Sequence, residues 1–285
     1  MELIIETYEY AVKNRDNILS SVDAVRQKEL MKLANEMWIN YVPKKVNANI
    51  AGIDSSWNAI GYHGFYLYAV DAVSVLADGS YAAPPKFEVG IGSMFISDEF
   101  IYNPSLWLES KGMKYEHDLS IESSGFTVLI DGSVLARFYD SRTRKISTFL
   151  EYASDLMKMS NIIFVAKSST SNAALHGAVG DLYYFSKAGN SAGFSKPFKD
   201  QKGVLVTYVR LADYTPVLRL EVTHDLNERE IMDIMDIVGS VSYDGYPYVL
   251  RLAHERCKIS NSDMALIEGA LGLSAEQSSR EVLGE

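Results

Sequence analysis

The order of the apolar runs is the feature that most restricts the fold of this chain. Three strand-like runs come first, at Asn49–Ser55, Phe65–Leu76 and Phe87–Phe95, and turn residues such as those in DGSYAAPP separate them. A helical stretch then opens at Asn103, and the continuous apolar run Phe126–Asp131 that follows it is typical of a buried strand. Three strands, a helix, a strand, a helix and a strand predict a mixed α/β sheet in one domain.

Helical patterns flank this sheet at both ends of the chain. Residues 6–40 place apolar side chains at helical spacing, and Pro43 ends that region. The other predicted elements are a helix at Ile146–Met159, strands in NIIFVAK, GVLVTYVRL and TPVLRLEVT, and helices at Asn227–Val238, Tyr246–Lys258 and Ser262–Leu271. We expect one domain over residues 1–285, made of N-terminal helices (1–45), a sheet core (46–225) and C-terminal helices (226–285).

Composition limits the partners and the compartment. The formal net charge is -10, so a nucleic acid would need a local basic groove on an otherwise acidic protein. Cys257 is the only cysteine, which excludes an internal disulfide and a cysteine zinc site and favours a reducing cytoplasm. The start MELIIETYEY lacks the basic residues of a signal peptide, and the apolar stretch GFYLYAVDAVSVLA is short for a membrane span. We expect a soluble cytoplasmic protein without a membrane partner.

Two of the strand-like runs end in an aspartate that small turn residues follow. GIDSS places Asp54 at such an end, and LIDGS places Asp131 at another. Ligands of open α/β sheets bind at the carboxyl ends of strands, and two neighbouring strands would bring these carboxylates together. Like charges at that separation need a cation between them or a proton on one of them, and their oxygens suit Mg²⁺ or Mn²⁺. Either motif alone is more typical of a turn, whereas the near-duplication favours a metal site.

The helix between these two motifs offers a third acid. Its candidates are Glu109, Glu116 and Glu122, although a helical glutamate usually lies on a solvated face. Glu116 lies midway along the helix and is the first choice, and Glu109 is the second.

The segment GYPYVLRLAHERC near the end of the chain carries two more candidates. Pro247 suits the first turn of a helix, on which Tyr246 and His254 would share one side at successive steps of four residues. A histidine there can ligate a metal or move a proton, and a tyrosine can hold a phosphate or a water. A buried histidine beside an aromatic plug explains this segment equally well.

Basic residues follow two of the strands. Lys167 ends NIIFVAK and is a candidate phosphate contact, with an ordinary strand-edge lysine as the alternative. Arg142 and Arg144 lie with Arg137 and Lys145 just after the second aspartate motif, where they would form a basic rim for DNA. A solvated helix start explains this cluster nearly as well.

Together these pieces resemble the NurA nuclease family of archaea and some bacteria, among the ribonuclease H-like metal nucleases. IAGIDSS, VLIDGSVL, IIFVAKSSTS, PVLRLEV and GYPYVLRLAH occur in the order of the family and span nearly the whole chain. One difference is DSSW in the first motif, where DGS is commoner. The resemblance implies a ribonuclease H-like mixed sheet flanked by helices, with helical additions at both ends.

The same resemblance implies a DNA nuclease that needs Mn²⁺ or Mg²⁺, with two ions expected. Such a nuclease would resect DNA ends for recombinational repair, as a homodimer and together with a HerA-type hexameric helicase. We expect a 5'-3' exonuclease on single- and double-stranded DNA that also cuts single strands internally.

Site residues follow from the same likeness. Asp54 and Asp131 would be metal ligands, and Tyr246 and His254 would be the catalytic or ligand pair. The helical glutamate of the family has no unambiguous counterpart in LESKGMKYEHDLSIES, so Glu116 is the third acid by its position on the helix, with Glu109 as the alternative. The Gly/Ser/Asn-rich stretch 168–195 would be a mobile loop that guides DNA. The alternative functions to a nuclease are a non-catalytic DNA-binding partner of a translocase and an actin-like ATPase.

Overall fold

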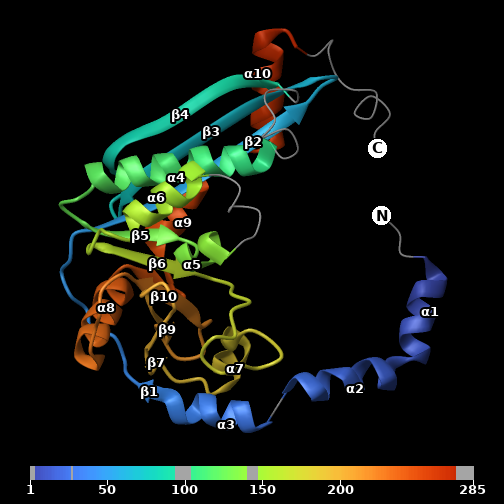
Figure 1. Ribbon diagram of the computed structural model, residues 1–285, viewed down its shortest axis with the longest axis vertical. Coiled ribbons are helices and arrows are strands. Elements are labelled where there is room, and N and C mark those ends of the chain that lie inside the picture. The colour runs from blue at the N-terminus through green and yellow to red at the C-terminus, as the bar shows by residue number, and fades with distance from the viewer. Residues whose placement is uncertain (1–3, 27, 94–103, 140–146, 274–285) are drawn as a thin grey trace.

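The computed structural model describes residues 4–26, 28–93, 104–139 and 147–273. Within these residues a ten-stranded sheet runs through the molecule, and helices cover both of its faces (Figure 1). Across the sheet the strands lie in the order β1 (Trp38–Asn40), β7 (Gly193–Ser195), β9 (Leu205–Arg210), β10 (Leu218–Val222), β6 (Ile162–Ala166), β5 (Thr127–Asp131), β2 (Ile50–Gly61), β3 (Phe65–Leu76) and β4 (Tyr81–Ser93). The short strand β8 (Phe198–Lys199) pairs with β9 outside this order.

The centre of the sheet is parallel and its two sides are antiparallel. β5 runs parallel to both β2 and β6, while β2, β3 and β4 form an antiparallel meander. The β6 strand is buried along its whole length, which explains its continuous apolar sequence, because helices pack on both of its faces. This arrangement confirms the predicted fold class, a ribonuclease H-like mixed sheet flanked by helices.

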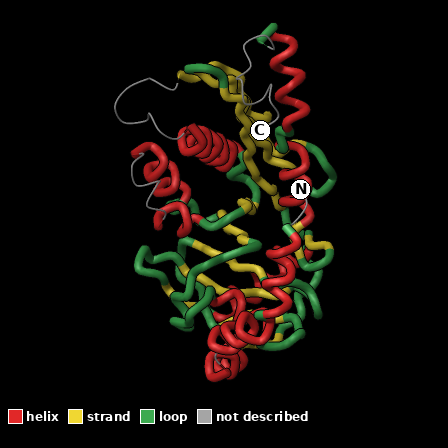
Figure 2. Tube along the Cα trace, turned by 90° about the vertical axis from the view of Figure 1, so that its right-hand side faces the viewer, coloured by secondary structure: helices red, strands yellow, loops and turns green. Residues whose placement is uncertain are grey.

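The two faces of the sheet carry different helices (Figure 2), and each face has its own hydrophobic core. One face holds α4 (Pro104–Glu122), α5 (Val134–Tyr139) and α6 (Ser147–Leu156), and the other holds α8 (Glu228–Ser240), α9 (Tyr248–Cys257) and α10 (Asn261–Leu271). Ile53, Ile130 and Phe164 pack under the first set, whereas Leu129 and Val165 pack under the second. Since side chains alternate along a strand, the residue after Ile53 and the residue after Ile130 point to the α9 face.

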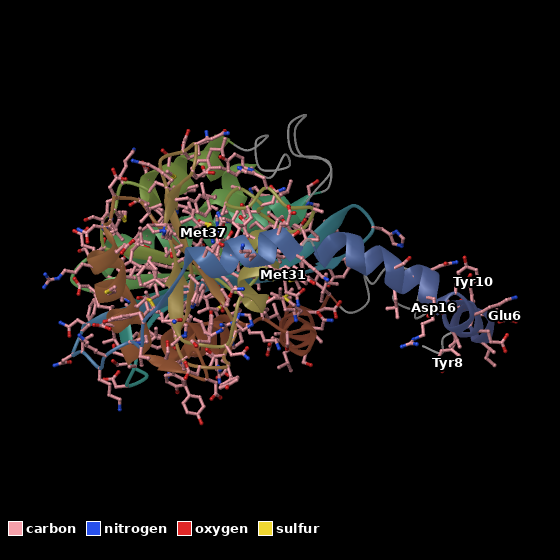
Figure 3. The ribbon with its side chains drawn as sticks, turned by 90° about the horizontal axis from the view of Figure 1, so that it is seen from below. Glu6, Tyr8, Tyr10, Asp16, Met31 and Met37 are labelled. Carbon is pink, nitrogen blue, oxygen red and sulfur yellow. The ribbon has the colours of Figure 1, made fainter. Side chains whose placement is uncertain are left out.

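The N-terminal helices form an arm that extends from the body. They are α1 (Ile5–Lys13), α2 (Arg15–Arg26) and α3 (Lys28–Met37). Figure 3 shows α1 and α2 projecting beyond the rest of the molecule, and α1 has no buried residue. By contrast, α3 buries Ala34 in a cluster with Tyr184 and Phe185 of α7 (Asp181–Lys187). The last part of the arm is therefore held by the body, and the first part is not.

Three predicted boundaries were wrong. The strand predicted from Phe87 begins at Tyr81 and includes Pro84 and Pro85, which an edge strand tolerates because one side of it has no partner strand among the described residues. The helical region ends at Met37, and the next three residues form β1. The stretch 168–195 is not one loop, since it contains α7 and β7.

A fourth correction concerns Tyr246. It belongs to the two-residue strand β12 (Tyr246–Pro247), which pairs with β11 (Ser242–Tyr243), and α9 starts only at Tyr248. Gly245 and Asp244 before it both have positive φ, so the chain makes a tight hairpin turn there instead of a helical one. Tyr246 and His254 therefore come from different elements.

Among the described helices, none combines the length and the apolar character that crossing a bilayer requires.

Candidate metal centre

The parallel register of β2 and β5 brings Asp54 and Asp131 together. Ile53 lies opposite Ile130, so the next residue of each strand is an aspartate that points to the α9 face. Asp131 ends β5, as expected, whereas Asp54 lies in the middle of β2, which continues to Gly61. The predicted strand end at Asp54 is therefore wrong, because pairing with β3 extends β2 beyond the last residue of β5.

His254 joins the two aspartates from α9. Its Nδ1 lies 2.9 Å from Oδ2 of Asp54, and each of Asp54, Asp131 and His254 offers one ligand atom within 4.8 Å of the others. The helix reaches this position because Gly52 has no side chain: a Cβ there would lie 2.6 Å from the backbone carbonyl of Val249. A glycine in β2 thus allows the close packing of α9 that carries the histidine to the aspartate.

Glu116 approaches the same strand from the other face of the sheet. It is 3% exposed on α4, and Ser55, the residue after Asp54, donates a hydrogen bond of 2.6 Å from Oγ to its Oε1. Its Oε2 lies 2.9 Å from a guanidinium nitrogen of Arg137. Glu116 does not belong to the group of three ligand atoms, yet it lies close enough to influence Asp54.

The other two glutamates of α4 have different surroundings. Glu109 is half-buried, and Glu122 is exposed and pairs with Lys86 at 2.5 Å. Of the three candidates for the third acid, only Glu116 is buried beside the aspartates, which supports the sequence-based preference for it.

The electrostatics of the centre are unfavourable without a cation. Burial, followed by the charges of Glu116 and Asp131, raises the pKa of Asp54 from 3.8 to about 6, while His254 acts in the opposite direction. Carboxylate oxygens and an imidazole nitrogen that converge in this way suit Mn²⁺ or Mg²⁺. The donor set and its excess of negative charge therefore fit the divalent metal that the sequence predicts.

Lys167 and Tyr246 line the open side of the centre. The Lys167 ammonium donates to Oδ2 of Asp131 at 2.8 Å and lies 4.5 Å from the ring centre of Tyr246. Burial and the charge of Asp131 raise the pKa of the Tyr246 hydroxyl, so it stays protonated and can donate a hydrogen bond. Both residues border a cavity of about 450 Å³ that Arg251 and His254 also line.

Sequence reasoning placed one basic residue, Arg137, wrongly and missed another, Arg251. Arg137 faces Glu116 and is not part of an outer rim, and Arg142 and Arg144 lie outside the described residues. Arg251 was missed, although it lies three residues before His254 and therefore on the same side of α9. The three-residue spacing between Arg251 and His254 could have identified Arg251 from the sequence.

Comparisons with known proteins agree with this geometry. The family model of the NurA domain matches residues 48–259. The chain belongs to the NurA family. As expected for such a member, the match includes both aspartate motifs, Glu116 and the segment with Tyr246 and His254.

Individual NurA proteins are similar over almost their whole length. The probable DNA double-strand break repair nuclease NurA of Methanocaldococcus jannaschii is 22% identical, over 97% of this chain and 92% of the relative. The NurA nuclease of Sulfolobus solfataricus has a crystal structure that superposes with a TM-score of 0.76 at 22% identity, covering 95% of this chain and 97% of the other. A NurA crystal structure bound to dAMP and manganese gives a TM-score of 0.65 at 13% identity, covering 93% and 97%. These likenesses confirm the NurA fold.

Proposed function

We propose that this NurA family member is a metal-dependent nuclease that hydrolyses phosphodiester bonds of DNA. The observation that carries the proposal is the convergence of Asp54, Asp131 and His254, whose ligand atoms lie within 4.8 Å of one another. A related NurA crystal structure is bound to manganese, which supports the choice of Mn²⁺, with Mg²⁺ as the other candidate.

Four residues would hold the metal. Asp54, Asp131 and His254 supply the converging ligand atoms, and Glu116 would complete the set for two ions. When bound, the ions would lower the pKa of a water and stabilise the leaving oxygen. On its exposed side His254 can also move a proton, because 55% of its side chain is accessible.

The remaining site residues would contact the DNA. Tyr246 presents a protonated hydroxyl that can orient a phosphate, and Lys167 offers a cation beside Asp131. Arg142 and Arg144 stay proposed as DNA contacts on the basis of their charge alone. Both single- and double-stranded DNA are proposed substrates, with 5'-3' exonuclease and single-strand endonuclease activity.

The partners that we propose are a second copy of the chain and a HerA-type hexameric helicase, in cytoplasmic DNA end resection. The N-terminal arm supports self-association, because Ile5, Tyr8 and Val12 are 71%, 63% and 57% exposed and lie at helical spacing. Sedimentation should show a dimer that Ile5→Glu with Tyr8→Glu converts to a monomer, whereas Glu9→Gln leaves it intact. A monomeric native protein would contradict the dimer, and cleavage that the helicase leaves unchanged would contradict that partnership.

One experiment tests the nuclease itself. End-labelled single- and double-stranded DNA is incubated with the protein, with Mn²⁺, with Mg²⁺ or with a chelator. We expect cleavage only with metal, and none from Asp54→Ala. Asp225→Asn is the matched control, because that carboxylate is exposed and pairs only with Lys199 at the surface in the described residues. Cleavage by Asp54→Ala at the native rate would refute the proposed site.

A further inference from the structure

A buried ion pair lies on the opposite side of the sheet from the metal centre. Arg219 and Glu221 are neighbours on one face of β10, only 3% and 0% exposed, and Nε of Arg219 donates to Oε1 of Glu221 at 2.7 Å. Glu221 lies opposite Phe164 of β6, which packs in the core under α4, α5 and α6. The pair therefore approaches the ends of β5 and β6 from the face away from His254.

Glu221 holds the turn that follows Asp131. Its Oε1 accepts a hydrogen bond of 2.5 Å from Ser133 Oγ, and its Oε2 accepts one of 3.1 Å from the backbone N–H of Leu135. Ser133 in turn accepts the N–H of Ala136 at 2.9 Å. The turn that begins two residues after Asp131 is thus tied to a fully buried carboxylate.

Arg219 holds the loop that follows Lys167. Its guanidinium donates a hydrogen bond of 3.0 Å to Oγ of Ser169, two residues beyond Lys167. Lys167 itself bonds to Asp131. The ion pair therefore contacts both chain segments that leave the sheet at the candidate centre.

Stability alone is a poor explanation for this arrangement. A buried ion pair usually contributes no more than apolar residues of the same size, because the charges must be desolvated. Here each side chain of the pair also bonds to one of the two turns, Glu221 to Ser133 and Leu135 and Arg219 to Ser169. Outer groups of this kind orient the residues that bind a metal, and losing one typically weakens metal binding about 10- to 100-fold.

We propose that Arg219 and Glu221 are positioning residues, which fix Asp131 through Ser133 and Lys167 through Ser169. This inference rests on the proposed function, since it assigns the pair a role in metal and DNA binding. The pair touches neither the three converging ligands nor the cavity beside them, so its effect is transmitted through the two serines.

Removing each serine hydroxyl in turn tests the Glu221–Ser133 contact and the Arg219–Ser169 contact separately. Ser133→Ala should weaken Mn²⁺ binding by about 10- to 100-fold in calorimetry, and Ser133→Thr, which keeps a hydroxyl, should restore it. Ser169→Ala should instead raise the Kd for DNA, measured by fluorescence anisotropy in chelator, with little change in Mn²⁺ affinity, and an unchanged Kd would overturn the role of Arg219 in fixing Lys167. Ser240→Ala is the control, because its hydroxyl bonds to the backbone of α8 on the other face.

A double variant distinguishes the effect of the Glu221–Ser133 bond from the local effect of Ser133, which also accepts the N–H of Ala136 at the start of α5. In a Glu221→Gln background, Ser133→Ala should weaken Mn²⁺ binding much less than it does alone. The reason is that the side chain at position 221, which accepts the Ser133 hydroxyl, no longer carries a charge. A full effect in both backgrounds, or native Mn²⁺ affinity of Ser133→Ala, would overturn the inference. If the native protein binds Mn²⁺ but cleaves no DNA, the proposed function fails while these affinities still decide the inference.

Discussion

Two buried carboxylates of the sheet, Glu221 and Asp54, have opposite electrostatic surroundings. Glu221 is fully buried, yet it receives hydrogen bonds from Arg219, Ser133 and the backbone of Leu135. Asp54 is almost as buried, and its neighbours include two further carboxylates, Glu116 and Asp131. Glu221 is compensated by these donors. Asp54 has the Ser55 N–H and His254 beside it, whereas the nearby cations Lys167 and Arg137 pair with Asp131 and Glu116.

The difference indicates where a bound cation would be needed. A chain that satisfies Glu221 so completely has the means to satisfy a buried acid, so the unfavourable surroundings of Asp54 call for an explanation outside stability. Perturbed carboxylates of this kind concentrate at functional sites. A divalent cation would supply the missing positive charge, and the predictions below test this contrast.

The largest effect is expected for the metal centre. Asp131→Asn should reduce Mn²⁺-dependent DNA cleavage by more than about 100-fold, because a direct ligand contributes more than the groups that orient it. The fold should persist, so circular dichroism and thermal unfolding of the metal-free variant should match those of the native protein. Normal cleavage by this variant would show that the metal assignment is wrong.

Breaking the Arg219–Glu221 pair should also lower the stability of the fold. Arg219→Met leaves Glu221 buried without its cation, which should lower the free energy of unfolding by about 3–5 kcal/mol. Urea denaturation measures this change. Exchanging an exposed cation that pairs at the surface, as in Lys199→Met, should cost less than about 1 kcal/mol. Equal costs for the two variants would remove the contrast between buried and exposed pairs.

Neutralising Asp54 should have the opposite sign. A rise of its pKa from 3.8 to about 6 corresponds to roughly 3 kcal/mol of unfavourable ionisation in the folded protein. Asp54→Asn should therefore stabilise the metal-free protein by up to about that amount at pH 7 to 8, and it should abolish the stabilisation that Mn²⁺ gives. A less stable Asp54→Asn variant in the presence of chelator would refute the picture of a strained centre.

The same group predicts a pH dependence. Asp54 binds its proton more tightly in the folded state than in the unfolded chain, so its contribution lowers stability as pH rises from about 4 to about 6. Asp71, whose pKa is raised to about 7 by burial and then by Asp54 and Asp263, extends the loss toward neutral pH. The measurement is the stability of Asp54→Asn minus that of the native protein, in chelator, across this range. We expect the difference to grow with pH, and a constant difference would contradict the raised pKa.

The smallest effect concerns the packing that assembles the centre. Gly52→Ala would place a Cβ 2.6 Å from the Val249 carbonyl and push α9 away from β2. Overpacking of this kind typically costs about 1–3 kcal/mol. Because His254 moves with α9, Mn²⁺ affinity should fall as well, whereas Gly125→Ala, which has open space around it, should change neither. Native Mn²⁺ affinity in Gly52→Ala would show that the position of α9 is not needed for metal binding.

Much of the fold was predictable because its signals are local. Continuous apolar runs identified the parallel strands at Phe126–Asp131 and in NIIFVAK, and the order of strands and helices predicted the mixed sheet. Element boundaries were less predictable where tertiary context decides. Pro84 and Pro85 read as a turn, and only the edge position of β4 makes a strand acceptable there.

By itself, the sequence determined the chemical types at the centre: two aspartates after apolar runs, a helical glutamate between them, and a late tyrosine and histidine. The tertiary structure decided which of these meet. The parallel register of β2 and β5 joins the aspartates, and Gly52 lets α9 bring His254 to them. Successive side chains of a strand point to opposite faces, so Asp54 faces His254 while the next residue, Ser55, faces the other way and bonds to Glu116. Glu116 therefore lies across the sheet from the three converging ligands. Register, packing distance and face are relations between distant segments, and no single stretch of sequence contains them.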